Sequence, residues 1–224
     1  MSHPTSTDPS PPTARGWVRE PFNTYSHAAG IALGLGGTLV LALLAEGSPL
    51  KLVGALVFGL TMTLMYASST LYHALHVSQK ALAALRRLDH AAIFLFIAGT
   101  YTPLLLQALE PSWRPWTLGG VWGLAGLGVL FRVFALKAPR WMYVLTYLGL
   151  GWLSVFLIPK LTLGPWSLAF LILGGAAYSI GAIIYGLKRP NPLPAVVGFH
   201  GIWHLLVLVG SIGMYLAVLM VYVA

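Results

Sequence analysis

Seven long apolar runs restrict what this chain can fold into. A helix needs about 20 mostly apolar residues to cross the hydrocarbon core of a bilayer, and each run is of that order. We therefore predict an all-α fold, a polytopic membrane bundle of seven helices. The expected spans are Tyr25–Ala45, Leu52–His76, Asp89–Leu109, Trp116–Leu136, Trp141–Pro159, Pro165–Leu187 and Val196–Val223.

The amino-acid composition also indicates a lipid environment. Of the 224 residues, 58% are hydrophobic and 8% are charged, whereas a soluble domain carries about 25% charged residues. The formal charge of +8 does not predict a nucleic-acid partner, because the lysines and arginines stand at the ends of the apolar runs. The chain has no cysteine, which excludes disulfides and thiolate metal sites.

Two regions are expected along the chain. Residues 1–19 are rich in Pro, Ser and Thr and predict a disordered N-terminal tail. They lack the run of roughly 7–15 apolar residues that a cleaved signal peptide needs. Residues 20–224 predict a single seven-helix domain, because the connections between the runs are too short to hold structure of their own.

The basic residues predict the orientation of the bundle. With seven spans, the alternating connections place ten lysines and arginines on one face and three on the other. The positive-inside rule then places the N-terminus in the cytoplasm and the C-terminus outside, for a multi-pass protein of the plasma (inner) membrane. The ten are Arg15, Arg19, Lys80, Arg86, Arg87, Arg132, Lys137, Arg140, Lys188 and Arg189, and the three are Lys51, Arg114 and Lys160.

Four ionisable residues stand within the predicted spans at their cytoplasmic ends. His73 lies near the end of the second span, Asp89 at the start of the third, and His200 and His204 near the start of the seventh. Ionisable groups at membrane depth are costly and are therefore functional candidates. The alternation of the spans brings these segments together although they are far apart in the sequence.

The spacing of these residues favours a metal site. His200 and His204 are four residues apart, so their side chains share one helix face, and Ser69 precedes His73 by the same interval. Three histidines suit Zn²⁺ and leave a fourth position for water. Asp89 is expected either to hold or deprotonate that water or to ligate the metal directly, and Ser69 to support the water or a ligand.

Each of these residues also has a simpler interpretation. A histidine pair in a helix can pack and hydrogen-bond without metal, Asp89 can cap the third span as its first residue, and Ser69 can bond to the preceding turn. His76 and His90 flank the expected site and are interpreted as interfacial residues. His27, with Glu20 and Asn23, forms a polar group at the start of the first span that is either an interfacial anchor or helix cap, or a support for the site.

Four segments, in this order, carry a resemblance to one membrane family. They are EPFNTYSH at 20–27, STLYH at 69–73, LDH at 88–90 and HGIWH at 200–204. Together on seven spans they resemble the hemolysin III family, the bacterial branch of the progestin and adipoQ receptor (adiponectin-receptor-like) family. The resemblance covers about residues 18–224.

The resemblance implies a seven-helix fold with a cytoplasmic N-terminus and a zinc site. In adiponectin receptors three histidines bind zinc near the cytoplasmic side, and an aspartate contacts the metal-bound water. By motif these ligands fall on His73, His200 and His204, the aspartate falls on Asp89, and the serine of the family's SxxxH motif falls on Ser69. The wider superfamily includes alkaline ceramidases, so the resemblance implies hydrolysis of a lipid amide and a role in membrane-lipid homeostasis.

Several functions are compatible with these residues. The leading hypothesis is a zinc-dependent hydrolase with catalytic Asp89 and Ser69 and a membrane lipid as substrate. The alternatives are a non-enzymatic membrane sensor or homeostasis factor with structural zinc, a cytolytic (hemolytic) protein as the family name suggests, and a proton or metal transporter. A transporter is disfavoured because no ladder of ionisable groups crosses the predicted spans. The sequence makes no prediction of oligomeric state.

Overall fold

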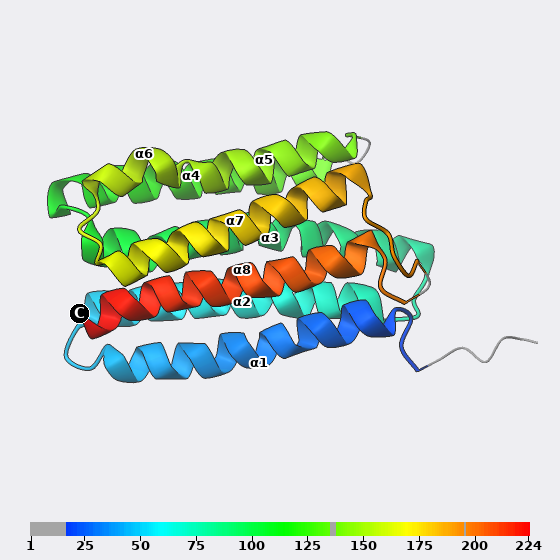
Figure 1. The fold of residues 1–224 in the computed structure, drawn as a ribbon, viewed down its shortest axis with the longest axis horizontal. Coiled ribbons are helices and arrows are strands. Elements are labelled where there is room, and N and C mark those ends of the chain that lie inside the picture. Colours follow the sequence, from blue (N-terminus) through cyan, green and yellow to red (C-terminus); the bar gives the residue numbers. More distant parts are fainter. Residues whose placement is uncertain (1–16, 135–137, 195) are drawn as a thin grey trace, which may run out of the picture.

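The fold is a bundle of membrane-length helices, seen in a computed structural model that describes residues 17–134, 138–194 and 196–224 (Figure 1). Seven helical segments in this part of the chain are long and apolar enough to cross a membrane, which confirms the predicted fold class. The elements are α1 (Pro21–Leu44), α2 (Pro49–Ala74), α3 (Gln79–Ala108), the 3₁₀ helix η1 (Pro111–Trp113), α4 (Arg114–Phe134), α5 (Arg140–Trp152), α6 (Ser154–Leu157), the 3₁₀ helix η2 (Ile158–Lys160), α7 (Pro165–Leu187) and α8 (Phe199–Val223).

The seven spans are arranged as a closed ring. Each span contacts the next along the chain, with α5, α6 and η2 together forming the fifth, and α8 closes the ring against α1. Helix α3 also contacts α5 and α8, and it is the most buried of the seven. We call the end of the bundle where α1, α3, α5 and α8 begin the histidine end; it lies on the right in Figure 1.

The local sequence explains where several helices begin. Pro21, Pro49 and Pro165 are the first residues of α1, α2 and α7, a position where proline loses no helical hydrogen bond. Helix α3 begins after Ser78, whose Oγ accepts a hydrogen bond from the main-chain N–H of Ala81 at 3.3 Å. A side-chain oxygen at this position satisfies one of the donors that a helix start leaves free.

The start of the third span corrects one prediction. Helix α3 begins at Gln79, so Asp89 lies ten residues inside the helix and cannot be its N-terminal cap. The segment between them, KALAALRRL at 80–88, carries three basic residues, and hydropathy therefore does not count it as a span. It is nevertheless composed of strong helix formers, so the helix extends beyond the apolar run.

Other boundaries move by smaller amounts. Helix α2 ends at Ala74 rather than His76, and α8 begins at Phe199 rather than Val196. The predicted end of the fourth span at Leu136 lies outside the described residues, as do residues 1–16 of the predicted tail. The last residue of that tail, Arg19, is held against α2 through a hydrogen bond from its main-chain N–H to the Ala74 carbonyl at 3.1 Å.

Glycines allow close helix packing at selected positions. A side chain at Gly30 in α1 would collide with the ring of Tyr66 in α2, and one at Gly213 in α8 would come within 2.9 Å of the Gly174 Cα in α7. Small residues at such contacts let helix backbones approach closely in lipid. Gly119 in α4 differs, because a side chain there would meet no atom within 4 Å.

Candidate metal site

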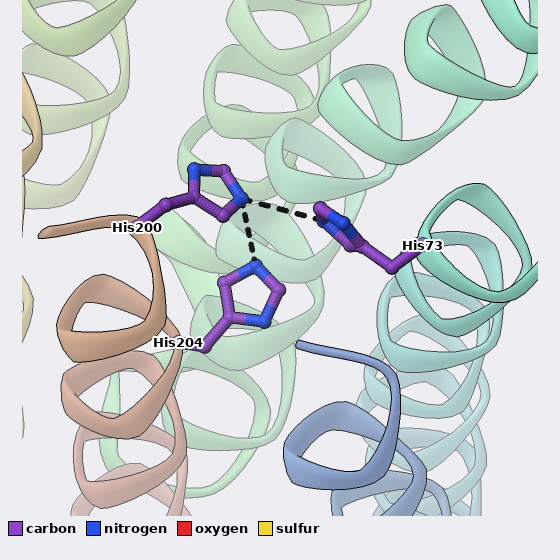
Figure 2. A group of neighbouring side chains, drawn as sticks. All are labelled: His73, His200 and His204. Atoms are coloured by element: carbon purple, nitrogen blue, oxygen red, sulfur yellow. Dashed lines mark hydrogen bonds between the residues drawn. The ribbon is translucent and has the colours of Figure 1, made fainter. Parts of the chain in front are cut away.

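Three histidine side chains converge at the histidine end of the bundle. His73 comes from the last turn of α2, and His200 and His204 come from the first two turns of α8. Figure 2 shows their rings pointing toward one another. One ring nitrogen from each lies within 4.8 Å of the others, so the three could hold a metal ion. The structure thus brings together the three histidines that the sequence selected.

The opposite ring nitrogens are engaged by hydrogen-bond acceptors. His73 Nδ1 lies 2.7 Å from a carboxylate oxygen of Glu20, and His204 Nδ1 lies 3.3 Å from the main-chain carbonyl of Asn23. Both acceptors take a proton from Nδ1, so in the neutral rings Nε2 carries the lone pair. Metal-ligating histidines are oriented in this way by outer carboxylates and carbonyls.

The Nε2 atoms are too close together for three neutral imidazoles to satisfy one another. His200 Nε2 lies 3.3 Å from His73 Nε2 and 3.0 Å from His204 Nε2. Since those two atoms present lone pairs, a single proton on His200 satisfies one contact and leaves the other repulsive. A cation among the three atoms removes the conflict. Two nitrogens bound to a tetrahedral zinc ion at about 2.0–2.1 Å are about 3.3 Å apart, which is close to both of these separations.

Glu20 stands just outside α1 and is anionic at neutral pH. Burial opposes its ionisation, but hydrogen bonds with His73 and Asn23 outweigh that effect and lower the pKa of the carboxyl to about 2. Asn23 Nδ2 donates to the carboxylate at 2.9 Å, and Arg19 Nη1 forms an ion pair with it at 2.5 Å. The sequence placed Glu20 in a polar group at the start of the first span but did not pair it with His73.

His27 packs against the histidine group inside the bundle and does not lie at the membrane interface. Its side chain is buried, and its ring stacks on His204 with the centroids 3.6 Å apart and the planes at 16°. On the other side it meets the edge of Tyr66 at 5.0 Å. Neither ring nitrogen has a hydrogen-bond partner among the described residues. This contact decides between the two interpretations of His27 left open by the sequence.

Asp89 and Ser69 lie beside the histidines, on the wall of a cavity that His200 and His204 also line. Both side chains are buried, and the Ser69 hydroxyl hydrogen-bonds the Asp89 carboxyl. Asp89 is not a member of the group of three close ligand atoms formed by the histidines. The structure therefore places Asp89 near the candidate metal position, whereas its role as a ligand stays a prediction.

His90 lies inside the bundle, contrary to the interfacial position predicted for it. Its Nδ1 accepts a hydrogen bond from Arg132 Nε at 2.9 Å, and its main-chain carbonyl accepts one from the Tyr147 hydroxyl at 3.1 Å. Arg132 is 1% exposed, although the sequence counted it only as a topology signal. His76, in contrast, is exposed just beyond the end of α2. The start of α3 at Gln79, more than two turns earlier, explains why His90 is internal.

A long apolar cavity of about 520 Å³ extends from the histidines toward the other end of the bundle; we call it the acyl cavity. Along α8 its wall includes His200 near the start and Met214 fourteen residues later, a distance of about 21 Å. Trp152 of α5 and Ile180 of α7 line this cavity and are also 52% and 51% exposed. Their exposure makes the region between these two helices a candidate opening of the cavity.

The fold and the site together define a polytopic helical membrane protein with a three-histidine group that could hold a metal ion. A family model described as Haemolysin-III related matches residues 15–215. The chain is 36% identical over 201 residues to "Hemolysin-3 homolog" of Bacillus subtilis (strain 168), covering 88% of this chain and 91% of that protein. It is 37% identical over 202 residues to "Hemolysin-3" of Bacillus cereus, covering 88% and 89%.

The chain belongs to the hemolysin III family, which confirms the resemblance seen in the sequence. It is a multi-pass membrane protein, and the bacterial plasma membrane is its expected location.

Proposed function

We propose that this protein is a zinc-dependent hydrolase that cleaves the acyl bond of a membrane lipid, with an amide bond as the first candidate. The observation that carries the proposal is the convergence of three histidine ring nitrogens, with His200 Nε2 3.3 Å from His73 Nε2 and 3.0 Å from His204 Nε2, beside a buried carboxyl. Three protein ligands with an open position are typical of catalytic zinc, whereas structural zinc usually has four. The group of three therefore favours hydrolysis over a purely structural clamp.

The residues of the chain take separate roles in this proposal. His73, His200 and His204 would hold the metal, which when bound would supply a Lewis acid and lower the pKa of a water molecule. Asp89 accepts the proton of the water that attacks the acyl carbon and returns it to the leaving amine as the C–N bond breaks. The hydrogen bond from Ser69 fixes the Asp89 carboxyl in position.

The acyl cavity supports a lipid substrate. Its length of about 21 Å exceeds the depth of one leaflet, which is about half of the 30 Å hydrocarbon core. Its wall is almost entirely apolar beyond the histidines, so a long acyl chain can lie along it with the scissile bond near the candidate metal. Entry from the bilayer would occur between Trp152 and Ile180, two wall residues that are about half exposed.

The orientation of the bundle is also part of the proposal. The histidine end carries Arg19, Lys80, Arg86, Arg140 and further basic residues, as the sequence count indicated. By the positive-inside rule this end faces the cytoplasm, so the lipid headgroup would be approached from the cytoplasmic leaflet.

The proposal is tested by lipid hydrolysis with purified, zinc-loaded protein in lipid nanodiscs. A long-chain ceramide serves as substrate, and released fatty acid is measured by mass spectrometry. We expect release by the unaltered protein, a loss of about 100-fold or more in His200→Ala, and near-normal release in His76→Ala, which alters an exposed histidine outside the group. Zinc-loaded protein that releases no fatty acid would contradict the hydrolase and favour a sensor with a structural metal.

A further inference from the structure

A second cavity, of about 880 Å³, opens at the histidine end, and its wall is strongly basic. Four arginines from different parts of the chain line it: Arg19, Arg86, Arg132 and Arg140. Among the described residues on its wall, Glu20 is the one carboxylate, and it is already engaged by Arg19 and His73. We call this space the headgroup cavity. Its remaining arginines face no acidic partner on the wall.

Arg132 is the most informative of these arginines. It is 1% exposed, and its Nη1 has no hydrogen-bond partner among the described residues. Its other contacts hold it rigidly, since Nε donates to His90 at 2.9 Å and the guanidinium carbon lies 4.4 Å from the centroid of the Tyr143 ring. A buried cation with a free donor is costly unless an anion approaches it.

Asp89 is close enough for its charge to act on Arg132, but it accepts no hydrogen bond from Arg132 Nη1. Asp89 is separated from Arg132 by His90, whose Nε2 lies 4.0 Å from the Asp89 carboxylate. Asp89 is already hydrogen-bonded by Ser69 and lines the acyl cavity rather than the headgroup cavity. Arg132, on the wall of the headgroup cavity, therefore retains a buried donor that no protein acceptor satisfies among the described residues.

Arg140 is held at the same cavity by a different helix. Its Nη1 donates to the Tyr185 carbonyl at 3.2 Å, and its guanidinium lies 4.6 Å from the Tyr185 ring centroid. The Tyr185 ring in turn lies 5.5 Å from that of His200. Contacts with Tyr185 therefore hold Arg140 in place at the cavity. The Tyr185 ring also contacts His200, one of the candidate metal ligands.

The two cavities share part of their walls. His90, Tyr143, Tyr185 and His200 line both of them. An amphiphile can therefore place its tail in the acyl cavity and its polar head in the headgroup cavity, with the bond between them passing the histidine group. The charge of the second cavity then determines which polar head is accepted.

We propose that the headgroup cavity binds the phosphate of a membrane phospholipid through Arg132 and Arg140. This inference rests on the proposed lipid substrate and adds a preference, among such lipids, for those that carry a phosphate. Guanidinium groups bind phosphate through two parallel hydrogen bonds, and basic pockets between membrane helices on the cytoplasmic side bind anionic headgroups. Free phosphate shares this chemistry, but only a lipid also fills the acyl cavity.

The test compares binding of phosphatidic acid, diacylglycerol with the same acyl chains, and inorganic phosphate to the zinc-loaded full-length protein in detergent. We expect phosphatidic acid to bind at least about tenfold more tightly than diacylglycerol, because charged hydrogen bonds contribute at this level. Inorganic phosphate should displace it only at far higher concentrations. Equal binding of the two lipids would overturn the proposal, and inorganic phosphate binding as tightly as phosphatidic acid would overturn its assignment to a lipid.

Substitutions of the arginines test whether these side chains cause the preference for phosphatidic acid over diacylglycerol. Arg140→Gln and Arg132→Gln should each lose the preference for phosphatidic acid. Arg114→Gln should keep it, since Arg114 also donates to a main-chain carbonyl, that of Leu109, but lies at the other end of the bundle. Because Arg132 is fully buried, the partly exposed Arg140 carries the test if Arg132→Gln does not fold. A preference retained in Arg140→Gln would overturn the proposal.

The unaltered protein separates this proposal from the hydrolase, because lipid binding and lipid hydrolysis are measured independently. If the unaltered protein shows the preference and hydrolyses no lipid, the hydrolase alone is refuted. If it hydrolyses lipid and binds both lipids equally, the phosphate site alone is refuted.

Discussion

Removing the Glu20 carboxylate should weaken zinc binding although Glu20 lies outside the group of three close ligand atoms. Its oxygen accepts a proton from His73 Nδ1 at 2.7 Å, and this contact fixes the ring so that Nε2 points toward His200 and His204. Loss of such an outer partner lowers metal affinity about 10–100-fold, which corresponds to about 1.4–2.8 kcal/mol. We expect Glu20→Ala to lie in this range.

A competition assay measures the effect. Purified protein in detergent is titrated with zinc against a chromogenic chelator of known affinity. Glu20→Gln should lose less affinity than Glu20→Ala, because the amide oxygen can still accept the His73 proton but carries no charge. Glu110→Gln should bind like the unaltered protein, because Glu110 is exposed at the other end of the bundle. Unchanged affinity in Glu20→Ala, or an equal loss in Glu110→Gln, would refute the reasoning.

Three further predictions concern packing, catalysis and orientation. Gly30→Val should destabilise the protein by about 1–3 kcal/mol, seen as a lower thermal midpoint, whereas Gly119→Val, with no atom within 4 Å, should not. Asp89→Asn should lower the rate of lipid hydrolysis about 10²–10⁴-fold and leave the zinc content unchanged. Loss of zinc in this variant would indicate that Asp89 binds the metal directly. Because the chain has no cysteine, single introduced cysteines report the orientation. Ser112→Cys should react with an impermeant thiol reagent in intact cells, and Gln79→Cys should react only after permeabilisation. The reverse pattern would contradict a cytoplasmic N-terminus.

The seven spans were predictable because lipid demands long apolar segments and the sequence supplies seven of them. The polar extension of α3 was not, since Gln79 and the basic residues after it contribute nothing to hydropathy. This difference matters for the site. It moves Asp89 and His90 from the membrane interface into the interior of the bundle, where one lines the acyl cavity and the other contacts Arg132.

The candidate ligands were predictable from the four-residue spacing of His200 and His204 and from the alternation that brings His73 to the same end. Their outer partners were not. Glu20 precedes His73 by 53 positions, and only the antiparallel contact between the start of α1 and the end of α2 brings the two together. The EPFN segment was the available signal, because a carboxylate and an amide directly before an apolar run are unusual at membrane depth.

Arg132 was misread for a different reason. Basic residues at span ends normally lie in the aqueous phase or the headgroup region, so charge counting treats them all alike. The sequence does not distinguish Arg132, which is buried against His90 and Tyr143, from Arg189, which is exposed. Only the packing of α4 against α3 shows that the guanidinium points inward.

The claim that His73, His200 and His204 hold a metal ion is tested most directly by the metal itself. Zinc per chain should be measured by elemental analysis in purified protein, with anomalous scattering at the zinc edge to locate the ion in crystals. We predict about one zinc per chain, located among the three Nε2 atoms and lost in His200→Ala. Zinc content that is unchanged in His200→Ala, or an anomalous peak away from the three histidines, would contradict the account.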